Sequence, residues 1–271
     1  MCSRRQLGLR VETGYDPFEL GEKASRSVTR ESCGVEERRY YRFRGGRWYG
    51  GIAAGDVVGC NLRCGFCWSW REASHVMAEG FFCRPEEAFK RLVNIADARG
   101  YGLVRLSGGE PSLSRKHVLR LLELFEKTRF KFVLETNGLL VGSDASYAEE
   151  LAQYRCLIVR VSLKGTCGDE FHALTLANPN FFSYQLNALK NLVDAGLEPG
   201  EQVYAAVMLS FSASENYENL KTRLAGIHPR LPLEIDEEYV ILYPHVAELM
   251  RRRGLKPKIA YTPNGVPRIM I

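Results

Sequence analysis

The sequence predicts an α/β fold, a partial (β/α)6 barrel preceded by a short N-terminal extension. Short apolar runs recur after residue 51, and windows with helical periodicity separate them. The runs read as continuous apolar segments, which is typical of parallel strands covered by helices. A chain of 271 residues is also long enough to build one α/β domain of barrel size.

The strands of this barrel are expected where the apolar runs lie. In chain order the expected ranges are Ile52–Val58, Leu103–Ser107, Lys131–Glu135, Leu157–Leu163, Val203–Leu209 and Tyr239–Tyr243. A polar motif follows each run. Because parallel α/β barrels build their sites at the carboxyl ends of the strands, we expect these motifs to share one rim.

The helices between the strands are marked by residues typical of helix ends. Pro85 is expected to open one helix and Gly100 to close it. Ser114 is the expected N-cap of the next helix. Two later helices are expected to end at Gly196 and Gly226.

Two domains are expected: a basic and aromatic extension over residues 1–50, and the barrel over residues 51–271. The extension carries eleven Lys and Arg against seven Asp and Glu, and arginines alternate with aromatic residues at 38–51. This run can contact nucleic acid, because Arg supplies charge and aromatic rings stack on bases. A β-hairpin turning at Gly45-Gly46 explains the same pattern and is favoured. Its inward-packed side chains would be Tyr41, Phe43 and Trp48.

The composition is typical of a globular protein of the cytoplasm. The chain is 45% hydrophobic and 25% charged. It shows no segment of secretory-signal or membrane-spanning type, so no membrane association is expected. The eight cysteines do not form a paired framework, and disulfides are not expected.

Three cysteines, Cys60, Cys64 and Cys67, form a CxxxCxxC triplet directly after the first expected strand. Three thiolates can bind a metal centre but leave one coordination position open, whereas a structural zinc or a closed iron–sulfur cube takes four protein ligands. An open position is where substrate binds in catalytic metal sites. The alternatives are three cysteines at coincidental spacing, or a zinc site completed by His75 or Cys83.

Further motifs follow the next three strands: Gly108-Gly109-Glu110-Pro111, Thr136-Asn137-Gly138, and Ser162 with Lys164. With the cysteine triplet, this set resembles the radical S-adenosylmethionine (radical SAM) superfamily over about residues 50–210. HALTLAN and QLNALKNLVDAG are further similar to the activating enzymes of glycyl-radical proteins. The resemblance implies a partial (β/α)6 barrel, a [4Fe–4S] cluster on the three cysteines, and S-adenosyl-L-methionine (SAM) at the open iron.

The resemblance also implies roles for single residues. The cluster would cleave SAM reductively to methionine and a 5′-deoxyadenosyl radical, which removes a hydrogen atom from the substrate. Phe66 lies at the position whose backbone meets the adenine. Gly108 and Gly109 let backbone approach the cofactor closely. Glu110 offers its carboxylate to the methionine ammonium.

Other candidate residues have two interpretations each. Thr136 and Asn137 can bind the ribose or the methionine carboxylate, or form a simple Asn-Gly turn. Ser162 and Lys164 lie at the end of the fourth strand, where Lys164 either pairs with the cofactor carboxylate or stays solvated. Cys167 either takes part in catalysis, as a hydrogen-atom donor or substrate anchor, or is a small core residue.

The sequence therefore predicts a radical SAM enzyme that receives electrons from a reductant such as ferredoxin or flavodoxin. Its substrate is left open between a protein glycyl site, a nucleoside or RNA, and a peptide, and its oligomeric state is also open. The alternative without enzymatic activity is an iron–sulfur electron carrier. A carrier requires a fourth cysteine ligand, which the sequence does not place near the triplet, and it gives Glu110 no role.

Overall fold

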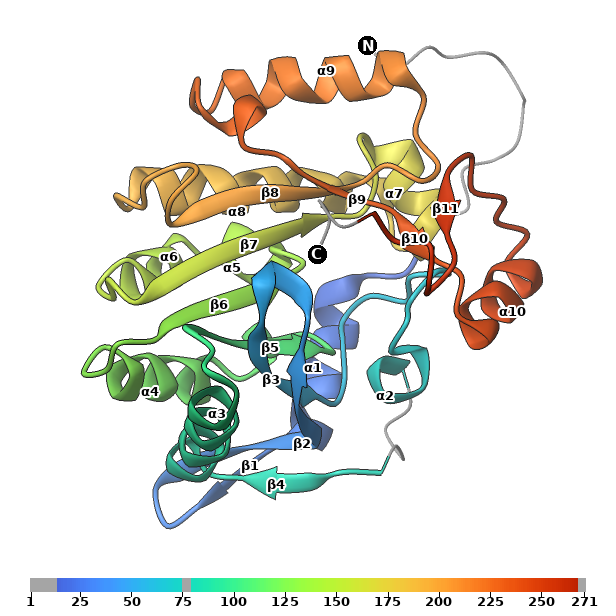
Figure 1. Cartoon of the computed structure of the whole chain (residues 1–271). Helices are drawn as coiled ribbons and strands as arrows, with labels where there is room; N and C mark the ends of the chain where they lie inside the picture. The colour runs from blue at the N-terminus through green and yellow to red at the C-terminus, as the bar shows by residue number, and fades with distance from the viewer. Residues whose placement is uncertain (1–13, 75–78, 268–271) are drawn as a thin grey trace.

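The computed structural model describes residues 14–74 and 79–267, and its centre is a run of six parallel strands (Figure 1). These are β3 (Ile52–Val57), β5 (Leu103–Gly108), β6 (Lys131–Thr136), β7 (Leu157–Leu163), β8 (Val203–Met208) and β9 (Asp236–Glu238). The sheet order runs from β1 at one end to β9 at the other. The barrel is therefore partial, as the sequence predicts.

Helices cover the outer face of these strands (Figure 1). The longer ones are α3 (Pro85–Arg99), α4 (Arg115–Phe125), α8 (Phe182–Asp194) and α9 (Ser214–Ala225), and the shorter ones α5 (Leu139–Ser143) and α6 (Ala145–Leu151). Val104, Leu134 and Val161 are completely buried on this face. Across residues 14–74 and 79–267, no helix is both long and apolar enough to cross a membrane.

The expected helix ends are confirmed in part. Pro85 opens α3, and Gly100 and Gly196 follow their helices with left-handed backbone, at φ of 68° and 101°. Helix α9 ends at Ala225 with Gly226 as its C-cap, as expected, although the backbone of Gly226 is right-handed, with a φ of −68°. Ser114 occupies the N-cap position of α4, but its hydroxyl donates to Glu36 Oε1 at 2.7 Å and caps nothing.

The strands before the barrel belong to the same sheet. Helix α1 (Pro17–Val28) precedes β1 (Thr29–Ser32) and β2 (Val35–Gly46), and β4 (Phe81–Cys83) also pairs with β2. Strand β2 runs antiparallel to β3 and forms a hairpin with it. The division expected after residue 50 falls in the turn of this hairpin; a separate domain over residues 1–50 stays a prediction.

The hairpin is confirmed, but its turn is not at Gly45-Gly46. Gly46 pairs with Ile52, so the turn is residues 47–51 and contains a 3₁₀ turn at Trp48–Gly50. The inward-facing rings differ only in part from the expectation, since Tyr41 and Phe43 pack against buried core residues as expected and Tyr40 is buried in addition. Tyr40 is completely buried and stacks on Phe43, with ring centroids 4.8 Å apart. A bulge follows Tyr40 in β2, and such a bulge shifts the alternation of side chains that the sequence pattern assumes.

The sixth strand was expected at Tyr239–Tyr243, and this position is wrong. The strand beside β8 is β9 at Asp236–Glu238, whereas Val240–Ile241 forms β10 and pairs with β11 (Ala260–Tyr261) in a separate two-stranded sheet. The apolar run is therefore not the barrel strand. Asp236 and Glu238 are tolerated in β9 because Arg160 of β7 binds both carboxylates, at 2.7 and 2.9 Å.

The remaining elements lie around the carboxyl ends of the strands, at the right of Figure 1. They are α2 (Trp70–Ser74), α7 (Gly168–Thr175) and α10 (Pro244–Arg252), with β10 and β11. This rim is where the cysteine loop and the other polar motifs meet.

Candidate active site

The cysteine loop that follows β3 is held by three separate parts of the chain. The hydroxyl of Tyr15 accepts a hydrogen bond from the Arg63 amide at 2.8 Å. The carbonyl of Leu174, in α7, accepts one from the Gly65 amide at 2.8 Å. Arg253, just after α10, donates from Nη1 to the Arg63 carbonyl at 3.1 Å. These three contacts position the loop.

The three thiols of this loop lie in one shielded environment. Burial raises the pKa of Cys60 above its ordinary value, and the nearby Glu110 and Cys64 raise it further. Burial raises the pKa of Cys67 to about 12, with a further contribution from Cys64. Cys64 raises the pKa of both other thiols because negatively charged thiolates at these positions would repel one another, which means that the three residues are close neighbours. A metal centre that binds thiolates would relieve this repulsion.

The donor set fits an iron–sulfur cluster. Soft thiolates are the usual ligands of such clusters, and each thiolate of a cube binds a different iron atom. Among residues 14–74 and 79–267, no three Cys, His, Asp or Glu side chains lie close enough together to hold a single metal ion. Of the two candidates for closing a zinc site, His75 lies outside the described residues. Cys83 lies in β4. Burial raises its pKa most, Glu87 and Glu37 raise it further, and Arg91 lowers it, so its main neighbours are these charged side chains and not the cysteines of the triplet.

The Gly-Gly-Glu motif after β5 packs directly on the chain leading to Cys60. The Gly109 amide donates to the Val57 carbonyl and the Glu110 amide to the Gly59 carbonyl, both at 2.8 Å. A Cβ atom at Gly109 would lie 2.1 Å from the Gly59 oxygen, and Gly108 has a φ of 91°. Both positions therefore require glycine. The approach to the cofactor expected of them stays a prediction.

The Glu110 carboxylate is buried and connects two loops of the rim. Its Oε1 accepts from the Ser112 amide, the Ser112 hydroxyl and the Thr136 hydroxyl, at 3.1, 2.7 and 2.7 Å. Its Oε2 accepts from the Asn137 amide at 2.8 Å. A carboxylate oxygen has two lone pairs, so Oε2 is the atom with capacity for a further donor.

Asn137 links the loop after β6 to the cysteine loop. Its Nδ2 donates to Asn61 Oδ1 at 2.6 Å and lies 3.9 Å from Cys60 Sγ. The Nδ2 group of Asn61 is buried without a hydrogen-bond partner among the described residues. Gln185 of α8, the first residue of the QLNALKNLVDAG segment but not an expected site residue, donates from Nε2 to the carbonyls of Asn137 and Ser162, at 2.5 and 3.0 Å.

The residues at the end of β7 and directly after it take part in ion pairs and hydrogen bonds with their neighbours. The Ser162 hydroxyl accepts from Arg160 Nη1 at 3.0 Å. Lys164 Nζ lies 3.8 Å from Glu238 Oε2, so Lys164 is not simply solvated. Pairing of Lys164 with a cofactor carboxylate stays a prediction.

Phe66 and Cys167 are the two remaining candidate site residues. Phe66 is largely buried, and its ring lies 5.8 Å from that of Phe211. Cys167 is half-buried at the N-cap position of α7, where its side chain caps nothing. The neighbouring Thr166 binds Glu170 Oε2 through its amide and hydroxyl, at 2.8 and 2.7 Å. A catalytic role of Cys167 stays a prediction.

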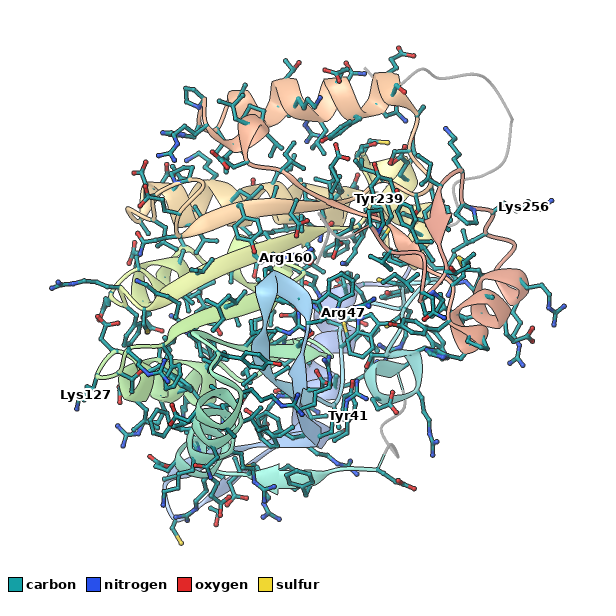
Figure 2. The ribbon with its side chains drawn as sticks, viewed as in Figure 1. Tyr41, Arg47, Lys127, Arg160, Tyr239 and Lys256 are labelled. Atoms are coloured by element: carbon teal, nitrogen blue, oxygen red, sulfur yellow. The ribbon has the colours of Figure 1, made fainter. Side chains whose placement is uncertain are left out.

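The inner face of the strands is polar, which the sequence analysis missed. Arg105 Nη1 lies 2.6 Å from Glu135 Oε1, and the Tyr49 hydroxyl, from the hairpin turn, donates to the same oxygen at 2.9 Å. Burial alone would raise the pKa of Glu135, but Arg105 and Arg160 outweigh it and hold the pKa at about 2. Figure 2 shows Arg160 on the strands of this face. A signal existed, because polar residues stand two positions apart within two of the apolar runs, Arg105 and Ser107 in one and Arg160 and Ser162 in the other.

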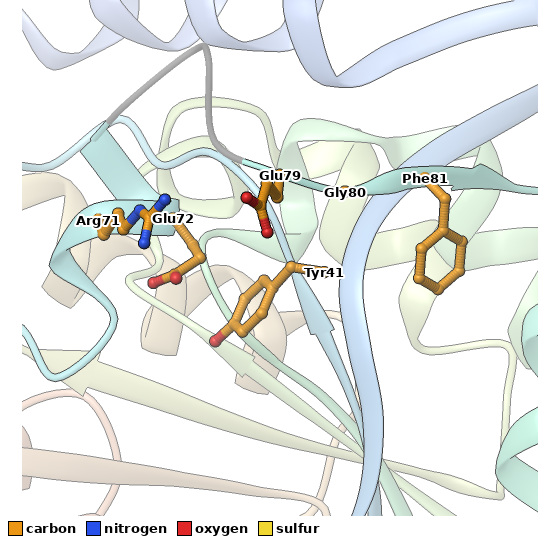
Figure 3. Close-up of a pocket in the computed structure, with 6 residues that line it drawn as sticks. All are labelled: Tyr41, Arg71, Glu72, Glu79, Gly80 and Phe81. Carbon is orange, nitrogen blue, oxygen red and sulfur yellow. The ribbon is translucent and has the colours of Figure 1, made fainter.

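One open cavity borders these motifs, because its lining residue Tyr41 lies next to Gly108 and the carbonyl of Glu72, another lining residue, accepts a hydrogen bond from the Gly59 amide at 2.9 Å. It has a volume of about 370 Å³ and is formed by residues around β2, α2 and β4 (Figure 3). Its lining residues are Tyr41, Arg71, Glu72, Glu79, Gly80 and Phe81. None of the candidate site residues lines it.

Comparisons with known proteins agree with the resemblance to the radical SAM superfamily. The model of the radical SAM superfamily matches residues 56–218. The chain is 30% identical over 191 residues to a 7-carboxy-7-deazaguanine synthase from Methanopyrus kandleri, covering 65% of this chain and 68% of the relative. It is also 30% identical over 145 residues to a probable GTP 3′,8-cyclase from Thermoplasma volcanium, covering 52% of this chain and 40% of the relative. It thus spans less than half of the cyclase.

Solved structures show the same fold. A spore photoproduct lyase variant with bound AdoMet and a dinucleoside spore photoproduct matches with a TM-score of 0.54 and 13% identity, over 80% of this chain and 65% of the other. The hydrogenase maturase HydG from Carboxydothermus hydrogenoformans matches with a TM-score of 0.52 and 13% identity, over 70% and 45%. Members of the family use a [4Fe–4S] cluster and SAM. The family model covers more than half of the chain, and the chain is therefore an enzyme of the radical SAM superfamily.

Proposed function

We propose that Cys60, Cys64 and Cys67 hold the [4Fe–4S] cluster and that the enzyme cleaves SAM reductively to start radical chemistry on a small polar substrate. When bound, the reduced cluster and SAM together supply a 5′-deoxyadenosyl radical, which removes a hydrogen atom from the substrate. The observation that carries the proposal is the convergence of the thiols, Glu110 and Asn137 at one rim of the sheet.

The residues of this rim would hold SAM in orientation. Glu110 Oε2, already bound by the Asn137 amide, would accept a hydrogen bond from the methionine ammonium. Thr136 and Asn137 are held by Glu110 and Asn61, so they would act toward SAM mainly by positioning the Glu110 carboxylate and the cysteine loop. Lys164 would remain paired with Glu238 or exchange that partner for the methionine carboxylate. Phe66 and the two glycines would complete the cradle.

We further propose that the substrate is a guanine-derived small molecule lying over the polar inner face. The names of both curated relatives contain such a compound, 7-carboxy-7-deazaguanine in one and GTP in the other. Arg105, Glu135 and Arg160 present charge-assisted donors and acceptors there, which are suited to the edge of a heterocycle. The similarity to glycyl-radical activating enzymes stays a prediction that neither relative supports.

Radical SAM enzymes need an electron donor. A ferredoxin or a flavodoxin is proposed here, since both deliver single electrons at low potential. The electron would enter from the outer side of the cysteine loop, where the Trp68 side chain is 39% exposed.

Anaerobic reconstitution tests the proposed function. The wild-type chain should bind four irons and four sulfides and release 5′-deoxyadenosine when reductant and SAM are added. Cys64→Ala should lose both properties together, because two thiolates cannot hold the cube. Cys33→Ser, at an exposed cysteine, is the matched control and should retain both. Cluster assembly and nucleoside release in Cys64→Ala would remove the triplet from the site.

The substrate class is tested separately with the reconstituted wild-type enzyme. Hydrogen abstraction would transfer deuterium from a deuterated guanine nucleotide into 5′-deoxyadenosine. Mass spectrometry should detect this label with the guanine compound and not with an adenine nucleotide. Equal labelling from a glycyl peptide, with none from the guanine compound, would favour the activating-enzyme hypothesis instead.

A further inference from the structure

A run of three arginines ends α10, and the third is placed differently from the first two. Arg251 and Arg252 both bind Glu248 within their own helix, and both side chains are at least 70% exposed. Arg253 instead reaches the cysteine loop, where its Nη1 donates to the Arg63 carbonyl at 3.1 Å. Its Nη2 is buried and has no hydrogen-bond partner among the described residues. A charged donor group is thus left available beside the loop.

The contact between α10 and the loop depends on Gly65, which stands between Cys64 and Phe66. A Cβ atom at Gly65 would lie 2.6 Å from Leu255 Cδ1 and 3.3 Å from Arg253 Cβ. The missing side chain lets the residues after α10 lie directly on the CxxC segment. The Gly65 amide is fixed from the other side by Leu174. Arg253 therefore lies against both chain neighbours of the second cysteine, Arg63 and Gly65.

We propose that Arg253 raises the reduction potential of the cluster, by directing its spare Nη2–H group and its positive charge toward the sulfur of Cys64. This inference rests on the proposed function, since it requires the cluster to sit on the triplet. Reduction adds one electron to the cluster, and a nearby cation stabilises the more negative form. Hydrogen bonds to cluster sulfurs act in the same direction. Arg253 is a positioning and tuning residue and not a catalytic one.

The test is a redox titration of the reconstituted enzyme, followed by electron paramagnetic resonance of the reduced cluster. Arg253→Met removes charge and donor while keeping an unbranched stem. The ratio of reduced to oxidised cluster at a fixed potential should fall about tenfold, which corresponds to about 59 mV for a one-electron couple. Arg253→Lys keeps the charge and should show a smaller fall. Arg252→Met, at an exposed position on the same helix, is the matched control and should leave the ratio unchanged.

Each outcome decides the proposal. An unchanged ratio in Arg253→Met, at full iron content, overturns it. If Arg253→Met binds no cluster, the same redox titration is made on Arg253→Lys and Arg253→Gln. Should these variants fold, as judged by circular dichroism, and also hold no iron, Arg253 is needed for loop assembly and the proposal is again overturned. A wild-type enzyme without a [4Fe–4S] signal would instead refute the proposed function itself.

Discussion

At the scale of single residues, several groups that the motifs do not include determine the geometry of the site. Arg38 of β2 is completely buried and donates from Nη2 to the carbonyls of Val58 and Glu110, at 2.6 and 3.3 Å. Burial lowers its pKa to about 10, so it stays charged at neutral pH. One guanidinium thus joins the chain before the cysteine loop to the Gly-Gly-Glu motif. The sequence shows that an arginine stands here but not that it is buried, because the other arginines of the same run are exposed or half-buried.

His117 of α4 is a buried residue with a defined tautomer. Its Nδ1 faces the Glu36 carbonyl at 3.2 Å, and its Nε2 lies 2.8 Å from the Tyr40 hydroxyl. A carbonyl can only accept, so Nδ1 carries the proton and Nε2 accepts from the tyrosine. Burial lowers the pKa of this imidazole from 6.5 to about 4. The folded protein therefore holds His117 neutral over a pH range in which the unfolded chain protonates it.

We expect this residue to make stability depend on pH. Between about pH 6.5 and pH 4 the unfolded chain binds more protons, so stability rises with pH across this window and is lost on acidification. The loss from His117 between pH 7 and pH 4.5 should be about 2–3 kcal/mol. Urea unfolding of the apoprotein at several pH values measures it. His117→Gln should flatten the dependence, and the exposed control His245→Gln should not; equal slopes in all three proteins would contradict the assignment.

At the scale of elements, the β2–β3 hairpin decides between two interpretations of the arginine and aromatic run. Arg42 and Arg44 both bind the carboxylate of Asp56, at 2.6 and 2.7 Å, and this carboxylate is completely buried. Arg47, in the turn, donates to the Pro263 carbonyl at 3.2 Å. Two of the three arginines are thus occupied in neutralising a buried charge within the hairpin. This arrangement favours a structural role over a nucleic-acid surface.

The double variant Arg42→Gln/Arg44→Gln should therefore be unstable. It leaves Asp56 buried without a cation, which costs about 3 kcal/mol. Arg42→Gln alone should cost less, because Arg44 still binds the carboxylate and Arg42 is 47% exposed. Adding Asp56→Asn to the double variant should restore part of the loss. Urea unfolding checks all three; unchanged stability together with weaker, salt-dependent RNA binding would instead assign the run to nucleic acid.

The same scale shows what the sequence could and could not predict. The first five barrel strands were found within a residue or so of their ends, because the outward-facing half of each strand is strongly apolar. The sixth, β9, has the sequence Asp-Glu-Glu and gives no such signal. Its place is decided by Arg160 on β7, which lies far away in the chain. A strand stabilised by distant charges has no local pattern for a periodicity analysis to detect.

At the scale of the whole molecule, the motifs were predictable because glycine, cysteine and acidic residues at fixed spacing each have a specific chemical use. The contacts that assemble them were not. Tyr15, Leu174 and Arg253 fix the cysteine loop from three parts of the chain separated by up to 238 positions (253 − 15). Gln185 ties the ends of β6 and β7 together from a helix. Such partners come from tertiary packing, and a single sequence contains no pairing information for them.

A site assembled from so many elements should couple SAM binding to global stability. SAM would contact loops after four strands, and a ligand that binds only the folded state stabilises it by RT ln(1 + [SAM]/Kd). We expect about 2.7 kcal/mol at 100 times Kd for the reconstituted enzyme, seen as a rise in the unfolding midpoint with the logarithm of SAM concentration. Glu110→Ala should retain its cluster but need more SAM for the same rise, because Thr136 and the Asn137 amide lose their acceptor. Glu110→Gln, which preserves shape without charge, should fall between the two. A Glu110→Ala enzyme stabilised at the wild-type SAM concentration would show that this carboxylate neither binds SAM nor shapes the loops that do.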